Sequence, residues 1–251
     1  MAQQRLDKII ASTGRYSRRE VKTLVREGRV LVDGRIAASA EDKCDPLTAR
    51  ISVNGEELFY REHTYVMLHK PAGVLSATED GRGETVLDLL APEYRKIGLF
   101  PVGRLDKDTE GLLLLTDDGA LAHDLLAPKK HVDKVYFVRT DGALDDADGK
   151  AFVQGITLGD GLECLPAKLE ILKSDAQSEA LITIREGKFH QIKRMLASRG
   201  KPVVYLKRLS MGSLTLDEGL SKGEYRLLTA EEIKNLRESG QFAQGKAGAD
   251  K

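Results

Sequence analysis

Metal-binding and disulfide-forming residues are scarce in this sequence. Its 251 residues include two cysteines and five histidines, and tryptophan is absent. Cys44 and Cys164 lie far apart with no Cys-x-x-Cys pair, which argues against a disulfide framework or a zinc site and is typical of a reducing cytosol. No histidine has the spacing of a metal ligand, so we expect no metal.

Long apolar runs and glycine-rich nucleotide motifs are missing as well. No run approaches the length of a membrane span and the N-terminus lacks a signal-peptide pattern, so we expect a cytoplasmic protein. No Walker loop and no Gly-x-Gly-x-x-Gly motif occurs, which argues against a nucleotide cofactor. A glycosidase with Asp106 and Asp108 as paired carboxylates is disfavoured, because sugar-binding aromatic residues are lacking around them.

The formal net charge is zero, but the charges are unevenly distributed. Residues 1–35 hold nine basic and four acidic residues, a local charge of +5, and residues 185–208 hold eight and one, giving +7. Residues 140–180 hold three basic and nine acidic residues, giving −6. A single charged run is most often a solvated face. Two basic segments that coincide with motifs favour a phosphate-bearing partner instead, since binding needs only a local positive surface.

The first 60 residues have the pattern of a small module of their own. Ser17 and Glu20 form a capping box that opens a helix with Val21 and Leu24 on its inner face. The outward face of this helix is basic and carries Arg18, Arg19, Lys22 and Arg26. Residues 30–36 predict a hairpin around an Asp-Gly turn. Over about residues 4–50 this pattern resembles the S4 RNA-binding domain, and a generic helical cap domain is the alternative.

The remaining chain predicts a larger α+β domain over residues 61–236, because its strands do not alternate regularly with long helices. Polar residues 56–64 indicate a linker, and the composition of residues 237–251 predicts a disordered tail. Strands are expected at residues 65–70, 135–138 and 181–184, and helices at 85–90, at 191–199 and after a second capping box at 229–232.

The most informative motif is GRLDKDTEGLLLLTDDG at residues 103–119. Four consecutive leucines predict a fully buried strand that the turn residues 117–119 end. Asp106 therefore lies on a loop anchored by a core strand, a position suited to chemistry, although Asp and Gly are also common turn formers. The run resembles the signature of RsuA-type pseudouridine synthases, enzymes that isomerise uridine within ribosomal RNA. The resemblance implies that Asp106 is the catalytic carboxylate and that Arg104 stabilises the gap left by a flipped base.

Two further motifs fit the same family. The segment DKVYFV at residues 133–138 resembles the family's Lys-x-Tyr strand, which implies that Tyr136 lies against the target base. The segment REGKFHQIKRM at residues 185–195 resembles the family's basic segment, which implies that Lys193 pairs with Asp106. A core aromatic and a solvated helix start are the ordinary interpretations of these segments.

The remaining candidate residues take supporting roles under this resemblance. Leu105 and Ile192 would exclude water from the detached uracil. Lys188 and Arg194 are candidates for RNA contact, as is the basic helix of the N-terminal module. The segment LHKPAGV at residues 68–74 resembles a family segment near the active site, with His69 in place of the usual asparagine.

The resemblance implies an α+β fold, an S4-like domain followed by a catalytic domain with a mixed, mainly antiparallel sheet and flanking helices. The expected activity is conversion of a uridine, most closely one in 16S rRNA, to pseudouridine. This isomerisation loses no group and changes no redox state, so we expect no cofactor. Nucleophilic attack and proton abstraction both remain open for Asp106. The alternatives are a 23S rRNA enzyme and a non-catalytic RNA-binding ribosome-assembly factor. We expect a monomer, since no exposed apolar helix face stands out.

Overall fold

The structure of the protein is a computed structural model, which describes residues 3–241. The chain divides into two compact units, residues 1–64 with 90–99 and residues 65–89 with 100–251. The sequence placed this boundary between residues 60 and 61. Within the described part of the chain, no helix has the length and apolar character to cross a membrane.

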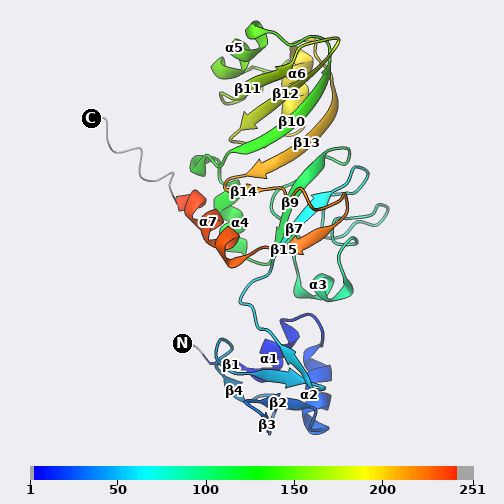
Figure 1. The fold of residues 1–251 in the computed structure, drawn as a ribbon, viewed down its shortest axis with the longest axis vertical. Coiled ribbons are helices and arrows are strands. Elements are labelled where there is room, and N and C mark those ends of the chain that lie inside the picture. The colour runs from blue at the N-terminus through cyan, green and yellow to red at the C-terminus, as the bar shows by residue number, and fades with distance from the viewer. Residues whose placement is uncertain (1–2, 242–251) are drawn as a thin grey trace, which may run out of the picture. The chain divides into compact units, whose positions relative to one another are not determined.

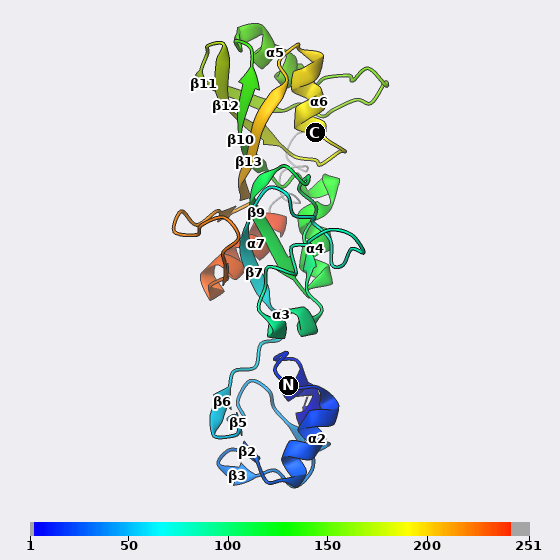
Figure 2. The same ribbon diagram turned by 90° about the vertical axis from the view of Figure 1, so that its right-hand side faces the viewer.

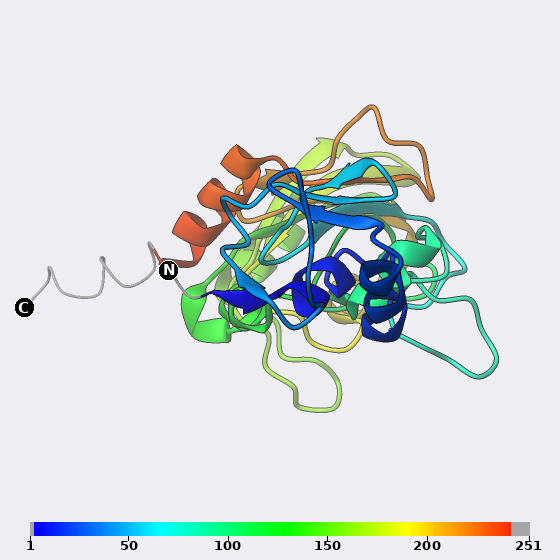
Figure 3. The same ribbon diagram turned by 90° about the horizontal axis from the view of Figure 1, so that it is seen from below.

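The first unit combines short helices with short antiparallel strands (Figure 1). Its helices are α1 (Leu6–Ala11), α2 (Arg18–Arg26) and α3 (Pro92–Ile97). Its strands are β1 (Gln4–Arg5), β2 (Val30–Val32), β3 (Arg35–Ile36), β4 (Lys43–Cys44), β5 (Ile51–Val53) and β6 (Glu56–Leu58). Strands β3-β2-β5-β6 form one sheet in that order, and β1 pairs with β4. Helices α1 and α2 contact each other beside these strands (Figure 3).

Helix α2 forms where the sequence predicted it. Ser17 Oγ accepts a hydrogen bond from the backbone N–H of Glu20, whose carboxylate accepts one from the N–H of Ser17. This capping box satisfies two of the donors that a helix start leaves free. Val21, Leu24 and Val25 are buried with the apolar face of α1. Apolar burial against α1 and the sheet therefore fixes which face of α2 remains exposed.

The prediction of a linker over residues 56–64 was wrong at its start. Residues 56–58 form β6, which pairs antiparallel with β5 at the edge of the sheet. An edge strand exposes much of its surface, so Glu56 and Glu57 remain in solvent while their backbone completes the sheet. Their polarity gave the segment the composition of a linker.

The second unit is built on a large mixed sheet with helices against it. Its strands are β7 (Tyr65–Lys70), β8 (Phe100–Pro101), β9 (Glu110–Thr116), β10 (Lys134–Asp141), β11 (Lys168–Lys173), β12 (Gln177–Ile184), β13 (Val203–Met211), β14 (Leu214–Thr215) and β15 (Tyr225–Leu227). Its helices are α4 (Gly119–Leu126), α5 (Asp146–Gln154), α6 (Gln191–Ser198) and α7 (Ala230–Gln241), with a 3-10 turn at Pro128–Lys130.

The strand order is β11-β12-β10-β13-β9-β7-β15, with β8 on β9 and β14 on β13. Strands β9 and β13 pair in parallel, and the other pairs of this sheet are antiparallel. Figure 2 shows α5 and α6 on the same face of strands β10–β13. The predicted α+β class with a mainly antiparallel mixed sheet is confirmed.

Strand β9 lies in the interior of this sheet, between β13 and β7. All four leucines of the run, Leu112 to Leu115, are 0% exposed. Leu112 and Leu114 pack in a core cluster with Leu121 and Leu125 of α4 and Leu236 of α7. Because both faces are covered, this strand is continuously apolar rather than alternating.

Two other local predictions were wrong. Residues 85–90 form turns rather than a helix, although Asp88 accepts hydrogen bonds from the N–H and hydroxyl of Thr85 as a cap would. The predicted disordered tail begins too early, because α7 continues through residue 241. Arg237 donates to the Tyr65 hydroxyl at 2.7 Å, which ties this helix to the sheet. Residues 242–251 lie outside the described part.

Candidate active site

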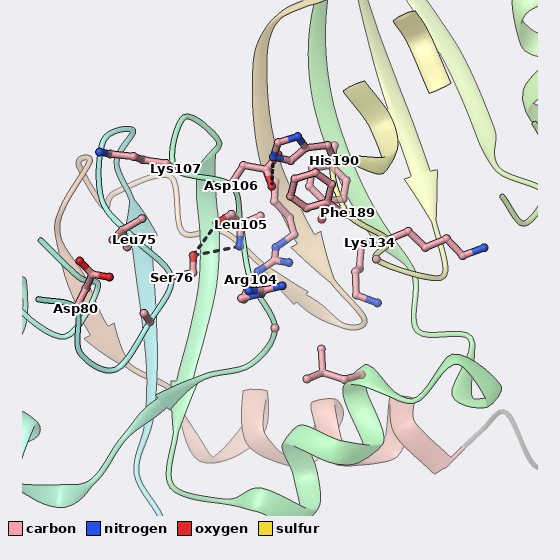
Figure 4. Close-up of a pocket in the computed structure, with 17 residues that line it drawn as sticks. Leu75, Ser76, Asp80, Arg104, Leu105, Asp106, Lys107, Lys134, Phe189 and His190 are labelled. Atoms are coloured by element: carbon pink, nitrogen blue, oxygen red, sulfur yellow. Dashed lines mark hydrogen bonds and ion pairs between the residues drawn. The ribbon is translucent and has the colours of Figure 1, made fainter. Parts of the chain in front are cut away.

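Asp106 lies on the loop between β8 and β9, and neighbouring polar groups fix this loop. Ser76 Oγ donates to the carbonyl oxygen of Leu105 at 2.9 Å and accepts from its N–H at 3.1 Å, as Figure 4 shows. The N–H of Thr109 donates to the carbonyl of Asp106 at 3.0 Å. The backbone beside the carboxylate is therefore held on both sides before any ligand binds.

A buried ammonium group lies beneath the same loop. Lys70, at the end of β7, is 0% exposed. Its Nζ donates to the carbonyl oxygens of Pro71, Asp106, Lys107 and Thr109 at 2.9 to 3.3 Å. Burial lowers the pKa of Lys70 to about 8, whereas the four carbonyl dipoles favour the charged form. The lysine ties the loop to β7.

Two basic side chains approach the Asp106 carboxylate. Lys193 Nζ lies 3.0 Å from Asp106 Oδ2, and His190 Nε2 lies 3.6 Å from Asp106 Oδ1. Lys193 also contacts Asp108 at 2.5 Å, so one ammonium bridges two carboxylates. The Asp106 side chain is 27% exposed and that of Lys193 22%, which leaves the carboxylate open to a ligand on one side.

Lys193 and Asp108 stabilise each other's charged forms. Burial lowers the pKa of Lys193, but its hydrogen bonds to Asp108 and Asp106 outweigh this and leave that pKa raised. The hydrogen bond from Lys193 likewise holds the pKa of Asp108 below its usual value. The cation therefore remains charged at neutral pH and orients both carboxylates.

Asp106 opens into a cavity of about 630 Å³. Its walls include Arg104, Leu105, Asp106, Lys134, Tyr136 and Arg208. Tyr136 is 7% exposed and lies on β10, directly opposite Arg208 on β13. Phe189 and His190 stack with ring centroids 3.8 Å apart, and Figure 4 shows His190 beside Asp106. The cavity combines a fixed carboxylate, aromatic rings and cations, which suits an aromatic base carried on a phosphate backbone.

The structure brings most of the predicted catalytic-domain residues together. Ile192 and Lys193 of α6 line a smaller cavity that shares Arg104, Leu105, Asp106 and Tyr136 with the large one. Lys188 also lines the large cavity, and its ammonium donates to the carbonyl of Glu163 and pairs with Glu186 at 3.2 Å. These residues come from the loop between β8 and β9, from β10, from the segment before α6 and from the first turn of α6.

Four predicted RNA-contact residues are not among the residues that line either cavity. Arg194 forms an ion pair with Asp160 at 2.6 Å and does not line either cavity. Arg18, Arg19 and Lys22 belong to α2 of the first unit, where all three are exposed. Arg18 contacts the buried Asp7 at 3.3 Å.

The sequence reasoning missed Arg208 of β13 and gave Lys134 no role of its own. Gly111 in the sequence could have indicated the close approach of another strand, which is the strand that carries Arg208. A Cβ at Gly111, whose φ is +105°, would lie 2.2 Å from the carbonyl oxygen of Arg208. Only glycine permits this approach, which brings the parallel strands β9 and β13 together and places Arg208 at the cavity.

No group of three or more His, Cys, Asp and Glu side chains within residues 3–241 is arranged to hold a metal ion.

The model of the family "RNA pseudouridylate synthase" matches residues 64–198, and that of the S4 domain matches residues 4–46. An uncharacterized RNA pseudouridine synthase of Bacillus subtilis is 50% identical, over 93% of this chain and 98% of its own length. The ribosomal small subunit pseudouridine synthase A of Vibrio cholerae is 40% identical, over 92% and 99%.

A relative named for the large ribosomal subunit is also similar to this chain. The ribosomal large subunit pseudouridine synthase B of Bacillus subtilis is 38% identical, over 93% of this chain and 96% of its own length. A crystal structure of a pseudouridylate synthase is 37% identical with a TM-score of 0.65, over 93% of this chain and 99% of that one. The matched family model, and these relatives along nearly their whole length, show that the chain belongs to the RNA pseudouridylate synthase family and carries an S4 domain at its N-terminus.

Proposed function

We propose that this enzyme converts a uridine of 16S rRNA to pseudouridine, with Asp106 as its catalytic carboxylate. The observation that carries the proposal is the Asp106 carboxylate, ion-paired with Lys193 at 3.0 Å and open to a cavity lined by Tyr136. The reaction detaches uracil from the ribose, turns the base and rejoins it through carbon 5. It therefore needs a carboxylate that stays ionised and in place while the base moves.

The surroundings of Asp106 support this role. Lys193 stabilises the negative charge, and the backbone contacts of Ser76 and Lys70 hold the loop at a fixed position. Preorganised charge is more effective than charge that must be assembled during the reaction. Asp106 acts on the ribose or the ring, as a nucleophile or as a base that removes a ribose proton.

Tyr136 and Arg104 support recognition of a base that has left the RNA stack. Enzymes that act on a base inside folded RNA must first extrude it. Tyr136 of β10 lines the cavity, and its ring would offer a surface for the extruded uracil. Arg104, two residues before Asp106, lines the cavity, which supports a role in stabilising the gap left in the RNA. Leu105 and Ile192 contribute apolar surface that limits access of water.

Ribosomal RNA is favoured by the relatives and by the first unit. The exposed basic face of α2 carries Arg18, Arg19 and Lys22, suited to the phosphates of a structured RNA. The segment at residues 185–195 resembles enzymes of the small subunit, which favours 16S over 23S rRNA. The name of the Vibrio cholerae relative points the same way, whereas that of the large-subunit relative keeps 23S rRNA as the alternative target.

The test is pseudouridine mapping on 16S and 23S rRNA transcripts treated with wild-type enzyme, Asp106→Asn or Asp146→Asn. Asp146 is an exposed residue of α5 that does not line the catalytic cavities, so its variant is the matched control. We expect one new site in 16S rRNA with wild type and Asp146→Asn, and none with Asp106→Asn. A site in 23S rRNA alone would overturn the 16S assignment. If Asp106→Asn remained active, Asp106 would not be the catalytic group.

If transcripts of both rRNAs stay unmodified, the same mapping is done on rRNA from cells with and without the gene, where assembling subunits supply the substrate. An unchanged set of sites in those cells would overturn the enzymatic proposal and favour the RNA-binding assembly factor.

A further inference from the structure

Two cations that take no part in the Asp106 ion pair are buried in the wall of the catalytic cavity. Lys134 of β10 is 6% exposed and Arg208 of β13 is 2% exposed, and both line the cavity. Their strands are neighbours. Arg208 lies directly opposite Tyr136, and Tyr136 is two residues after Lys134 on β10. The cations therefore flank the ring to which the proposed function assigns the target base.

Neither cation has an acidic partner among the described residues. Lys134 Nζ has one long hydrogen bond, 3.4 Å to the carbonyl of Val132. Arg208 donates from Nε to the carbonyl of Leu112 at 2.8 Å, and its buried Nη2 has no hydrogen-bond partner. The nearby Asp133 is engaged with Arg185 at 2.7 Å. Donors are left over on both side chains.

Lys70 shows what a purely structural buried cation looks like in this chain. Its Nζ is surrounded by four carbonyl oxygens, more acceptors than its three protons require. Lys134 is nearly as buried but has one distant acceptor. Burial and then the charge of Arg208 lower the pKa of Lys134 to about 8, and the charge of Asp133 offsets this only in part. Because burial lowers the pKa of both lysines to about the same value, the difference between them lies in the number of acceptors around the ammonium.

We infer that Lys134 and Arg208 form a binding site for a phosphate group of the RNA backbone. A buried charge without a partner destabilises the free protein, and a ligand of opposite charge removes that penalty. Uracil is neutral, whereas each phosphodiester carries a negative charge and oxygens that lysine and arginine bind well. The inference rests on the proposed function in one respect, that the ligand of the cavity is RNA.

The decisive variant is Lys134→Met, which replaces the ammonium by an apolar side chain of similar length. Binding is measured with the full-length protein in an Asp106→Asn background, so that no product forms, on 16S and 23S rRNA transcripts across a salt series. The control is Lys150→Met in the same background, because Lys150 is an exposed residue of α5 outside both catalytic cavities. Lys134→Arg restores the charge.

We expect Lys134→Met to bind the transcripts about tenfold more weakly at low salt. The slope of log K against log salt should fall by about 0.7 to 0.9, the loss of one phosphate contact. Lys134→Arg and Lys150→Met should keep the slope of the parent protein. The midpoint of thermal unfolding of Lys134→Met should equal or exceed that of the parent, because the variant loses an uncompensated charge.

Either of two results would overturn the inference. An unchanged affinity and salt slope would show that Lys134 does not contact phosphate. A Lys134→Met protein that unfolds at lower temperature, or does not fold, would show that the ammonium is a structural element like Lys70. Arg208→Lys, which keeps the charge but not the second donor arm, should weaken binding in the same assay without changing the salt slope by a full contact.

Inorganic phosphate alone distinguishes the source of the ligand. If phosphate raises the unfolding temperature of wild type but not of Lys134→Met, while RNA binding is the same for both, the site binds a free anion and the assignment to RNA is overturned. Pseudouridine mapping with wild type separates this inference from the proposed function. Product formation tests only the proposed function. The comparison of RNA binding between Lys134→Met and its parent tests the phosphate site whether or not wild type forms product.

Discussion

The two units of this protein hold their cations in opposite ways. In the first unit, the basic residues of α2 are exposed, and carboxylates of the same unit lie beside two of them. Arg18 contacts Asp7 at 3.3 Å, and Lys22 contacts Glu41 at 3.4 Å. In the second unit, Lys134 and Arg208 are buried in a cavity wall with no acidic partner among the described residues. The exposed cations of α2 are solvated and screened by salt, whereas the buried Lys134 and Arg208 are screened much less.

This difference separates two kinds of RNA recognition. Exposed cations cost the free protein little, and exchanging a surface carboxylate or counterions for RNA phosphate gives affinity that falls steeply with salt. Buried cations destabilise the free protein and can be placed accurately, so they act on a particular phosphate rather than on RNA in general. Under the proposed function, the first unit holds the RNA and the second sets the position of the RNA at Asp106.

The largest expected effect concerns the stability cost of Lys134 and its dependence on pH. Its pKa is about 8 in the folded protein and 10.5 in the unfolded chain. Between these values the unfolded chain binds more protons, so the contribution of this group to the free energy of unfolding rises with pH. The full difference corresponds to about 3 kcal/mol.

Lys134→Met removes this titration. We expect its advantage in unfolding free energy over wild type to be greatest at pH 7 and to shrink as pH rises from 8 to 10. Denaturant unfolding at pH 7, 8.5 and 10 checks this, with Lys150→Met as the control. A difference that does not change with pH would contradict the cost assigned to the buried charge.

The next largest effect concerns Lys193, a half-buried cation that does have carboxylate partners. Lys193→Met leaves Asp106 without its orienting partner, and misplacing a catalytic group by about 1 Å can cost about a hundredfold in rate. We expect kcat to fall about tenfold to a hundredfold with little change in KM, and Lys193→Arg to recover most of it. Steady-state kinetics check this prediction, with the unmodified rRNA transcript in which wild type forms pseudouridine as the substrate. Equal losses for Met and Arg would argue against a role of the charge.

The smallest effect concerns two neighbouring arginines of α2. Arg19 is exposed with no ion pair among the described residues, whereas Arg18 contacts the buried Asp7. We expect Arg19→Gln to weaken rRNA binding a few-fold and to lower the salt slope, without changing kcat or the free energy of unfolding. Arg18→Gln should also reduce the free energy of unfolding, by at most about 1 kcal/mol, because Arg5 still pairs with Asp7.

Salt-dependent binding and denaturant unfolding of both variants provide the comparison. If both arginine variants bound RNA as wild type does, the basic face of α2 would not be an RNA surface.

Local rules predicted the elements whose residues bond or pack within their own segment. The capping boxes at Ser17 and Thr229 formed as expected, because both partners lie within three residues of each other. The run from Leu112 to Leu115 formed the buried strand β9, since four consecutive large apolar side chains must be covered on both faces.

Local rules failed where distant contacts decided the outcome. Edge pairing with β5 made a strand of residues 56–58. The contact of Arg237 with Tyr65 and the burial of Leu236 against the sheet extended the final helix beyond the point where composition changes. Residues 85–90 carried the signals of a capped helix but formed turns instead.

The sequence by itself determined the family, the order of the two domains and the residues of the Asp106 motif, because these depend on spacing along the chain. Only the tertiary structure brought Lys134 and Arg208 together without a carboxylate, since they lie on strands that are neighbours in space but 74 residues apart in the chain. The charge of a residue is written in the sequence. Whether that charge has a partner depends on which strands pair. Strand pairing depends on the burial of apolar side chains along the whole sheet.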